Sequence, residues 1–138
     1  MADTYTVGDV MVRDVLTVEP HTKLLDCAKK MAEKKVGCLV IVIDDQVKGM
    51  LTEQDLARKV VAQEIDAKET PVSEIMSVQI TTITPDRDIR DAIQLMGTNE
   101  IKHLPVLVDN KLAGIITFKD IIKIEPALIE LLSFKSAN

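Results

Sequence analysis

Aromatic residues are scarce in this sequence, which has one Tyr, two Phe and no Trp among 138 residues. A chain with so few aromatic side chains offers few platforms on which nucleic-acid bases could stack. The net charge of −5 also removes the electrostatic attraction that dominates nonspecific affinity for DNA and RNA. We therefore expect that nucleic acid is not a partner and that the core is aliphatic.

Long apolar runs and paired cysteines are absent as well. No run approaches the roughly 20 apolar residues that cross a bilayer, and the start Met1-Ala2-Asp3-Thr4 lacks the basic and apolar regions of a signal peptide. Cys27 and Cys38 form no CxxC pair and lie among apolar residues, where a free cysteine usually packs as a small hydrophobe. These features predict a cytoplasmic protein with no membrane partner and two reduced, structural thiols.

An internal repeat covers most of the chain. A shift of about 65 positions aligns 7–57 with 72–122 without a gap, and roughly eleven of the aligned pairs are identical. Most other pairs keep their apolar or polar character. The alignment predicts two copies of one unit at 7–62 and 72–124, a linker at 63–71 and a C-terminal helical tail at 125–138.

Each copy has the pattern of a βαββα unit. A short extended segment precedes an amphipathic helix, and a continuous apolar run then indicates a strand buried on both faces. A tight turn at Asp44-Asp45 or Asp109-Asn110, a second strand and a second helix complete the unit. The first extended segment is expected at 15–18 in the first copy and at 80–83 in the second. The buried strand is expected at 36–43 and 101–108, and the second helix at 53–62 and 118–124. A further helix is expected in the tail at 127–134. Since one unit leaves a sheet face uncovered, we expect an α/β (α+β) fold with two repeats packed sheet to sheet about a pseudo-twofold axis.

The most specific shared string is Gly49-Met50-Leu51-Thr52-Glu53-Gln54-Asp55, repeated as Gly114-Ile115-Ile116-Thr117-Phe118-Lys119-Asp120. The glycine allows the backbone to approach a flat ligand. The threonine lies where a strand gives way to a helix, whose first N–H groups favour an anion such as phosphate. The aspartate can accept hydrogen bonds from the vicinal hydroxyls of a ribose. Together these features indicate a nucleotide site.

A structural role is the alternative for this string. Thr-x-x-Asp is close to a capping box, in which the two side chains satisfy N–H groups at the start of a helix. Two occurrences at equivalent positions, each with the preceding glycine, favour a ligand role in at least one copy, with capping as a compatible second role.

With these two strings, and with the segment Ile101-Lys102-His103-Leu104-Pro105-Val106, the sequence resembles the CBS-domain family, named for cystathionine β-synthase. The resemblance extends over nearly the whole chain. It implies a tandem CBS pair, or Bateman module, that binds adenosine nucleotides (AMP, ADP or ATP) or S-adenosylmethionine between its repeats. It implies no required cofactor and no metal.

The resemblance also implies which residues would share a cleft, because in this family the string of one copy faces strand-flanking residues of the other. The first cleft would contain Gly49, Met50, Thr52, Asp55, Ser77, Val78, Ile80, Lys102, His103, Pro105 and Lys119. The second would contain Gly114, Thr117, Asp120, Val12, Arg13, Val15, Gly37 and Cys38. Lys102, His103 and Lys119 would offer positive charge to phosphates, so the first cleft is expected to be the tighter nucleotide site. The alternatives are a solvent-exposed Lys102 or Arg13 and a structural His103.

An enzyme is the rival function. Catalysis would require a nucleophile with a base, a carboxylate pair or a metal cluster, and the sequence displays none of these. We expect a sensor that regulates a separate partner protein; a module for another adenosyl ligand and a purely structural dimerisation module are the alternatives. A homodimer is also expected, because the second helices and the tail carry more aliphatic residues than one small body is expected to cover. The residues concerned are Leu56, Val60, Ile121, Ile122, Leu128, Leu131 and Leu132.

Overall fold

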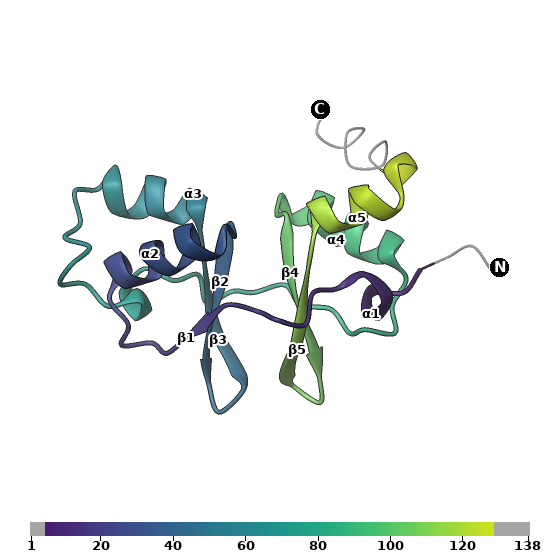
Figure 1. Cartoon of the computed structure of the whole chain (residues 1–138), viewed down its shortest axis with the longest axis horizontal. Coiled ribbons are helices and arrows are strands. Elements are labelled where there is room, and N and C mark those ends of the chain that lie inside the picture. Colours follow the sequence, from purple (N-terminus) through teal and green to yellow (C-terminus); the bar gives the residue numbers. More distant parts are fainter. Residues whose placement is uncertain (1–4, 129–138) are drawn as a thin grey trace. The chain divides into compact units, whose positions relative to one another are not determined.

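The computed structural model describes residues 5–128, which form two compact units (Figure 1). The first, Val15–Ile80, is called the Thr52 unit below. The second joins 5–14 to 81–128 and is called the Thr117 unit. Segment 7–14, which opens the first repeat in the sequence, therefore packs with the second repeat, and the linker and 72–80 pack with the first. Both units combine helices with β-strands, as the expected α+β class requires.

The Thr52 unit contains a three-stranded sheet of order β1-β2-β3, in which β1 is parallel to β2 and β2 is antiparallel to β3. Its hairpin turns at Asp44 and Asp45, both with positive φ, a conformation that aspartate tolerates better than most residues. The elements are β1 Thr17–Val18, α2 Leu24–Lys34, β2 Cys38–Ile43, β3 Gln46–Thr52, α3 Glu53–Asp55, the π-helix η1 Leu56–Val61 and the 3-10 helix η2 Val72–Glu74.

The Thr117 unit is built on the antiparallel hairpin β4–β5, with helix α1 packed against α4 and α5. Its elements are α1 Val7–Val10, α4 Ile89–Asn99, β4 His103–Val108, β5 Lys111–Thr117, α5 Phe118–Ile124 and η3 Pro126–Leu128. Residues 129–138, and with them most of the expected tail helix 127–134, lie outside the described residues.

The extended segment expected at 80–83 contributes a single bridge, between Ile83 and Val106, and no strand. The equivalent segment of the first repeat forms β1, helped by a hydrogen bond from the Val40 N–H to the Leu16 carbonyl at 3.0 Å. Val40 corresponds to Pro105 in the second repeat, and proline has no N–H to donate. The missing donor explains why pairing stops at one residue there.

The second helices of the two repeats also differ. The helix expected at 118–124 is present as α5, whereas the one expected at 53–62 begins as α3 and continues as π-helix η1, in which the Ala62 N–H donates to the Ala57 carbonyl at 2.9 Å. π-helical turns are rare and occur often beside functional sites. This one follows Asp55 directly.

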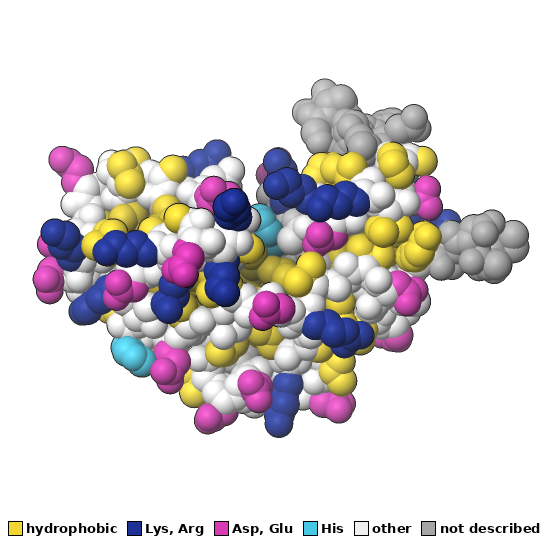
Figure 2. All heavy atoms as spheres, in the orientation of Figure 1, with side chains coloured by type: hydrophobic (Ala, Val, Ile, Leu, Met, Phe, Trp, Pro, Cys, Tyr) yellow, Lys and Arg dark blue, Asp and Glu magenta, His cyan; other side chains and the backbone are white. Residues whose placement is uncertain are grey.

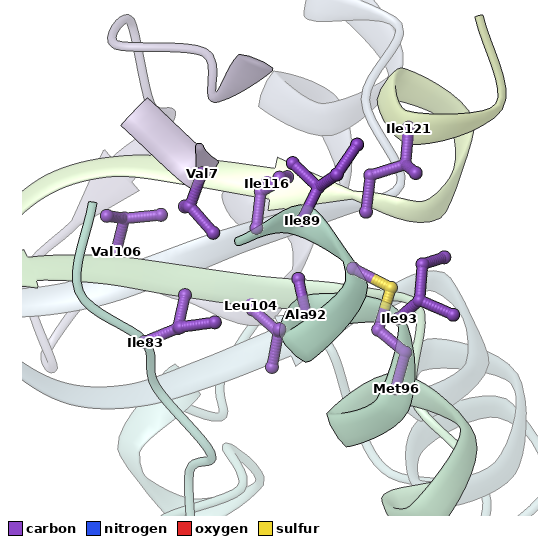
Figure 3. Packing of buried hydrophobic residues seen from close by; sticks show 10 residues of the cluster. All are labelled: Val7, Ile83, Ile89, Ala92, Ile93, Met96, Leu104, Val106, Ile116 and Ile121. Carbon is purple, nitrogen blue, oxygen red and sulfur yellow. The ribbon is translucent and has the colours of Figure 1, made fainter. Parts of the chain in front are cut away.

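Each unit has its own aliphatic core. In the Thr117 unit the strand residues Leu104, Val106 and Ile116 pack against α4 and α5, and Val7 of α1 joins them (Figure 3). In the Thr52 unit the corresponding cluster contains the strand residues Leu39, Ile41 and Leu51. The other buried hydrophobic residues of this cluster are Val18, Leu24, Cys27, Met31, Val60 and Val72.

The burial of Val60 and Ile121 corrects the expected basis for a homodimer. Val60 is 3% exposed and Ile121 is fully buried, each in the core of its own unit. Neither side chain is available for contact with a second copy. Leu131 and Leu132 lie outside the described residues, as does the side chain of Leu128.

The surface carries charges of both signs. On the face drawn in Figure 2, Lys and Arg side chains are interspersed with Asp and Glu side chains. Among the described helices, none combines the length and the hydropathy of a membrane span.

Candidate functional site

Thr52 and Asp55 meet at the junction of β3 and α3. The Thr52 backbone is extended, and its hydroxyl accepts a hydrogen bond from the Asp55 N–H at 3.2 Å. Asp55 Oδ2 in return accepts from the Thr52 N–H at 3.0 Å. The capping box that the sequence left open as an alternative is therefore present, and it leaves Oδ1 of Asp55 for other partners.

Thr117 and Asp120 repeat this arrangement in the other unit. The Asp120 N–H donates to Thr117 Oγ1 at 3.2 Å, and Asp120 Oδ2 accepts from the Thr117 N–H at 3.3 Å and from the Thr117 hydroxyl at 2.7 Å. Both of these bonds to the Asp120 carboxylate use Oδ2. Its Oδ1 can still accept from a ligand.

The glycines of the two strings are explained by packing. A Cβ on Gly49 would lie 2.7 Å from Met76 Cγ, and one on Gly114 would lie 2.8 Å from the Val12 carbonyl oxygen. At Gly114 a backbone atom of another segment leaves no room for a side chain, whereas at Gly49 the neighbour is the flexible Met76 side chain. Packing thus gives each glycine a structural role, and the approach of a ligand to these strings stays a prediction.

Ser77 lies beside the Thr52–Asp55 string. Met50 and Ser77 exchange two backbone hydrogen bonds of 3.0 and 2.9 Å. The Ser77 hydroxyl oxygen accepts a hydrogen bond from Lys59 Nζ at 3.1 Å, and the same nitrogen lies 3.3 Å from Asp55 Oδ1. Lys59 was missed by the sequence analysis, although its position four residues after Asp55 is the spacing of a helical ion pair.

Among the described residues of the Thr117 unit, the position equivalent to Lys59 is not a lysine. Val12 exchanges backbone hydrogen bonds of 2.8 and 2.9 Å with Ile115, as Ser77 does with Met50. By the repeat alignment Val12 corresponds to Ser77, and Ile124 corresponds to Lys59. Arg13, next to Val12, is exposed. The two strings therefore share their caps and differ in the side chains around them.

The remaining candidates are placed within their own units. In the Thr52 unit, Cys38 is buried opposite Thr52 in the β2–β3 pairing, Val78 is 67% exposed, and Val15 and Ile80 are half-buried. In the Thr117 unit, Pro105 is buried, Lys102 and Lys119 are exposed, and half-buried His103 is the pairing partner of Thr117. That Lys102, His103 and Lys119 bind the phosphates of a nucleotide at the Asp55 string stays a prediction.

Both cysteines are free and buried. Burial raises the pKa of the Cys38 thiol to about 12 and that of the Cys27 thiol to about 11. A thiol with such a pKa is uncharged near neutral pH, whereas the thiolate is the nucleophile and the metal ligand. This supports the structural role expected for the two thiols.

Comparison with known proteins gives the family. The family model described as "CBS domain" matches residues 7–62 and 72–126. "Uncharacterized protein MK0525" of Methanopyrus kandleri is 40% identical over 126 residues, which are 90% of this chain and 64% of that protein. This chain therefore spans slightly less than two thirds of that relative.

Solved structures agree with the family model. A putative signal-transduction protein with CBS domains from Burkholderia ambifaria is 40% identical with a TM-score of 0.77, and the match covers 80% of this chain and 82% of that one. The CBS domain pair of protein MJ0100, solved in complex with 5-methylthioadenosine and S-adenosyl-L-methionine, gives a TM-score of 0.81 at 24% identity, over 90% of this chain and 98% of that one. With the repeated strings, the capping boxes and these matches, the chain belongs to the CBS-domain family as a tandem pair.

Proposed function

We propose that this chain is a regulatory module that binds an adenosine nucleotide, AMP, ADP or ATP, at its Thr-x-x-Asp strings and controls a partner protein in trans without catalysing a reaction. The observation that carries the proposal is the Asp55 site, where a lysine lies within hydrogen-bond distance of both a partly exposed carboxylate and a serine hydroxyl. A carboxylate suits ribose hydroxyls, and the ammonium and hydroxyl groups suit phosphate oxygens.

The adenosine part of the proposal has support from a protein of the same fold. The CBS domain pair of protein MJ0100 was solved with two adenosyl compounds, 5-methylthioadenosine and S-adenosyl-L-methionine. An S-adenosylmethionine-binding module is accordingly the second candidate. It differs from the first in needing no phosphate-binding cation, so the charge of the preferred ligand separates the two.

Thermal unfolding with added ligand tests the function. A ligand that binds only the folded chain stabilises it by about 2.7 kcal/mol when its concentration is a hundredfold above Kd. We expect this stabilisation from at least one of AMP, ADP and ATP, and less from S-adenosylmethionine or NAD. The chain with both Asp55→Ala and Asp120→Ala is the control. A melting temperature unmoved by millimolar amounts of every compound would contradict the proposal.

A homodimer remains part of the proposal, on a different surface from the one first expected. Val61 and Ile65, at and after the end of η1, are 74% and 36% exposed. Light scattering at micromolar concentration is expected to give twice the chain mass, and Val61→Glu is expected to shift the protein towards monomer, because a buried unpaired carboxylate is costly. A monomer at this concentration, both with and without nucleotide, is the contrary result.

A further inference from the structure

Lys59 links the two polar side chains that border the Asp55 string. Its ammonium nitrogen lies 3.3 Å from Asp55 Oδ1 and 3.1 Å from the Ser77 hydroxyl oxygen. The side chain of Asp55 is 14% exposed and that of Lys59 is 45% exposed. The lysine therefore covers the carboxylate oxygen that the capping box leaves unused, and it does so from a solvent-accessible position.

This arrangement occurs in one of the two repeats only. The caps, the strands and the backbone pairing beside each string are equivalent in the two units, but the Thr117 unit has Val12 and Ile124 where the Thr52 unit has Ser77 and Lys59. In the described part of the Thr117 unit, a ligand at Asp120 therefore meets no counterpart of Lys59. A ligand at Asp55 must first displace Lys59 from Oδ1 or share that oxygen with it.

The displacement favours ligands that carry a phosphate. An ion pair with a partly exposed lysine is weak, so ribose hydroxyls can replace the ammonium on Asp55 at little cost. The released lysine is a donor without acceptor capacity, and a phosphate oxygen satisfies it through a charge-assisted hydrogen bond that the Ser77 hydroxyl can supplement. An uncharged nucleoside also displaces the lysine from the carboxylate, but it has no phosphate oxygen to accept a hydrogen bond from the lysine.

We propose that Lys59 acts as an exchangeable counter-ion that makes the Asp55 site selective for phosphorylated adenosine compounds, while the Asp120 site, without that lysine, does not discriminate by phosphate. The inference rests on the proposed function and deepens it. Lys59 pairs with Asp55 in the absence of ligand and binds the phosphate when the ligand is present.

Calorimetric titration with AMP and with adenosine tests the role of Lys59. The parent chain carries Asp120→Ala, so that only the Asp55 site contributes. Adding Lys59→Gln is expected to weaken AMP binding by about tenfold or more, and to leave adenosine binding unchanged or improved because its competitor for Asp55 is gone. Lys29→Gln, which removes the same charge from an exposed position on α2, is expected to leave both affinities unchanged.

The reciprocal variant introduces the serine and the lysine of the Asp55 site at the equivalent positions of the Thr117 unit. In a chain with Asp55→Ala, the substitutions Val12→Ser and Ile124→Lys are expected to raise the ratio of AMP to adenosine affinity by about tenfold. Both positions are exposed, with Val12 at 41% and Ile124 at 43%, and circular dichroism checks that each variant is folded.

The outcomes separate this inference from the proposed function. If the parent chain binds adenosine and AMP and Lys59→Gln leaves their affinity ratio unchanged, the selectivity role of Lys59 is wrong and the nucleotide function stands. If neither the parent nor the wild-type chain binds either compound, the nucleotide function is wrong and this inference falls with it.

Discussion

Asp55→Ala is expected to remove most of the nucleotide binding of this protein, whereas Asp120→Ala leaves the stronger binding event nearly intact. Both substitutions delete a carboxylate that can accept from ribose hydroxyls. Only the carboxylate of Asp55 lies beside Lys59, the group that we assign to phosphate, so the stronger binding event is expected to depend on Asp55. Titration calorimetry with AMP and ATP, corrected for the folded fraction of each variant, measures the difference.

Capping must be separated from binding in this experiment. Each aspartate accepts from the N–H of its threonine, so each substitution is expected to lower the free energy of unfolding by about 0.5–2 kcal/mol. If Asp55→Ala lowers stability by this amount and affinity per folded molecule is unchanged, the aspartate has only the capping role. If Asp120→Ala abolishes binding and Asp55→Ala does not, the tighter site is in the Thr117 unit.

The strands and caps could be predicted because their signals lie in side-chain patterns. The continuous apolar runs predicted β2 and β4, and both strands follow them with their first two residues trimmed. The hairpin turns at Asp44 and Asp109 and the strand ends at Thr52 and Thr117 were predicted from local residue chemistry and are present. The repeat alignment transferred each of these features from one copy to the other.

The packing of segment 7–14 with the second repeat was implied by the resemblance, which places Val12 and Arg13 beside Thr117 and Asp120, and not by the residues alone. The backbone hydrogen bonds between Val12 and Ile115 join N–H and carbonyl groups that nearly all residues have, so they leave no sequence signal. In contrast, the loss of a strand at 80–83 had a sequence signal, since Pro105 lacks the N–H that Val40 donates. The alignment treated Val40 and Pro105 as equivalent apolar residues, so the missing N–H was overlooked.

The residues of the candidate site were only partly anticipated. The repeated string pointed to Thr52 and Asp55, the resemblance to CBS domains pointed to Ser77, and the structure brings these three residues together. Lys59 has no counterpart in the second copy, because Ile124 occupies the equivalent position. A comparison of the copies for what they do not share would have singled it out. The search for positive charge went instead to Lys102, His103 and Lys119.

The largest loss of stability is expected from Ile121→Ala. Ile121 is fully buried among Ile89, Ile93 and Ile116 and their neighbours in the Thr117 unit (Figure 3). Deleting its side chain leaves a cavity and lowers the free energy of unfolding by about 2–5 kcal/mol. Ile122→Ala, at a half-buried position on the same helix, is the matched control and is expected to cost less. Urea unfolding measures both.

The same pair of variants distinguishes a core residue from an interface residue. If Ile121 belongs to the core, as its burial within one chain indicates, the loss is independent of protein concentration and the mass measured by light scattering stays unchanged wherever the chain is folded. A residue that served dimerisation would show the reverse, with a lower mass and a loss of stability, relative to the wild type, that changes with protein concentration. That reverse result, or an Ile121→Ala chain as stable as the wild type, would contradict the assignment of Ile121 to the core of α5 and β5.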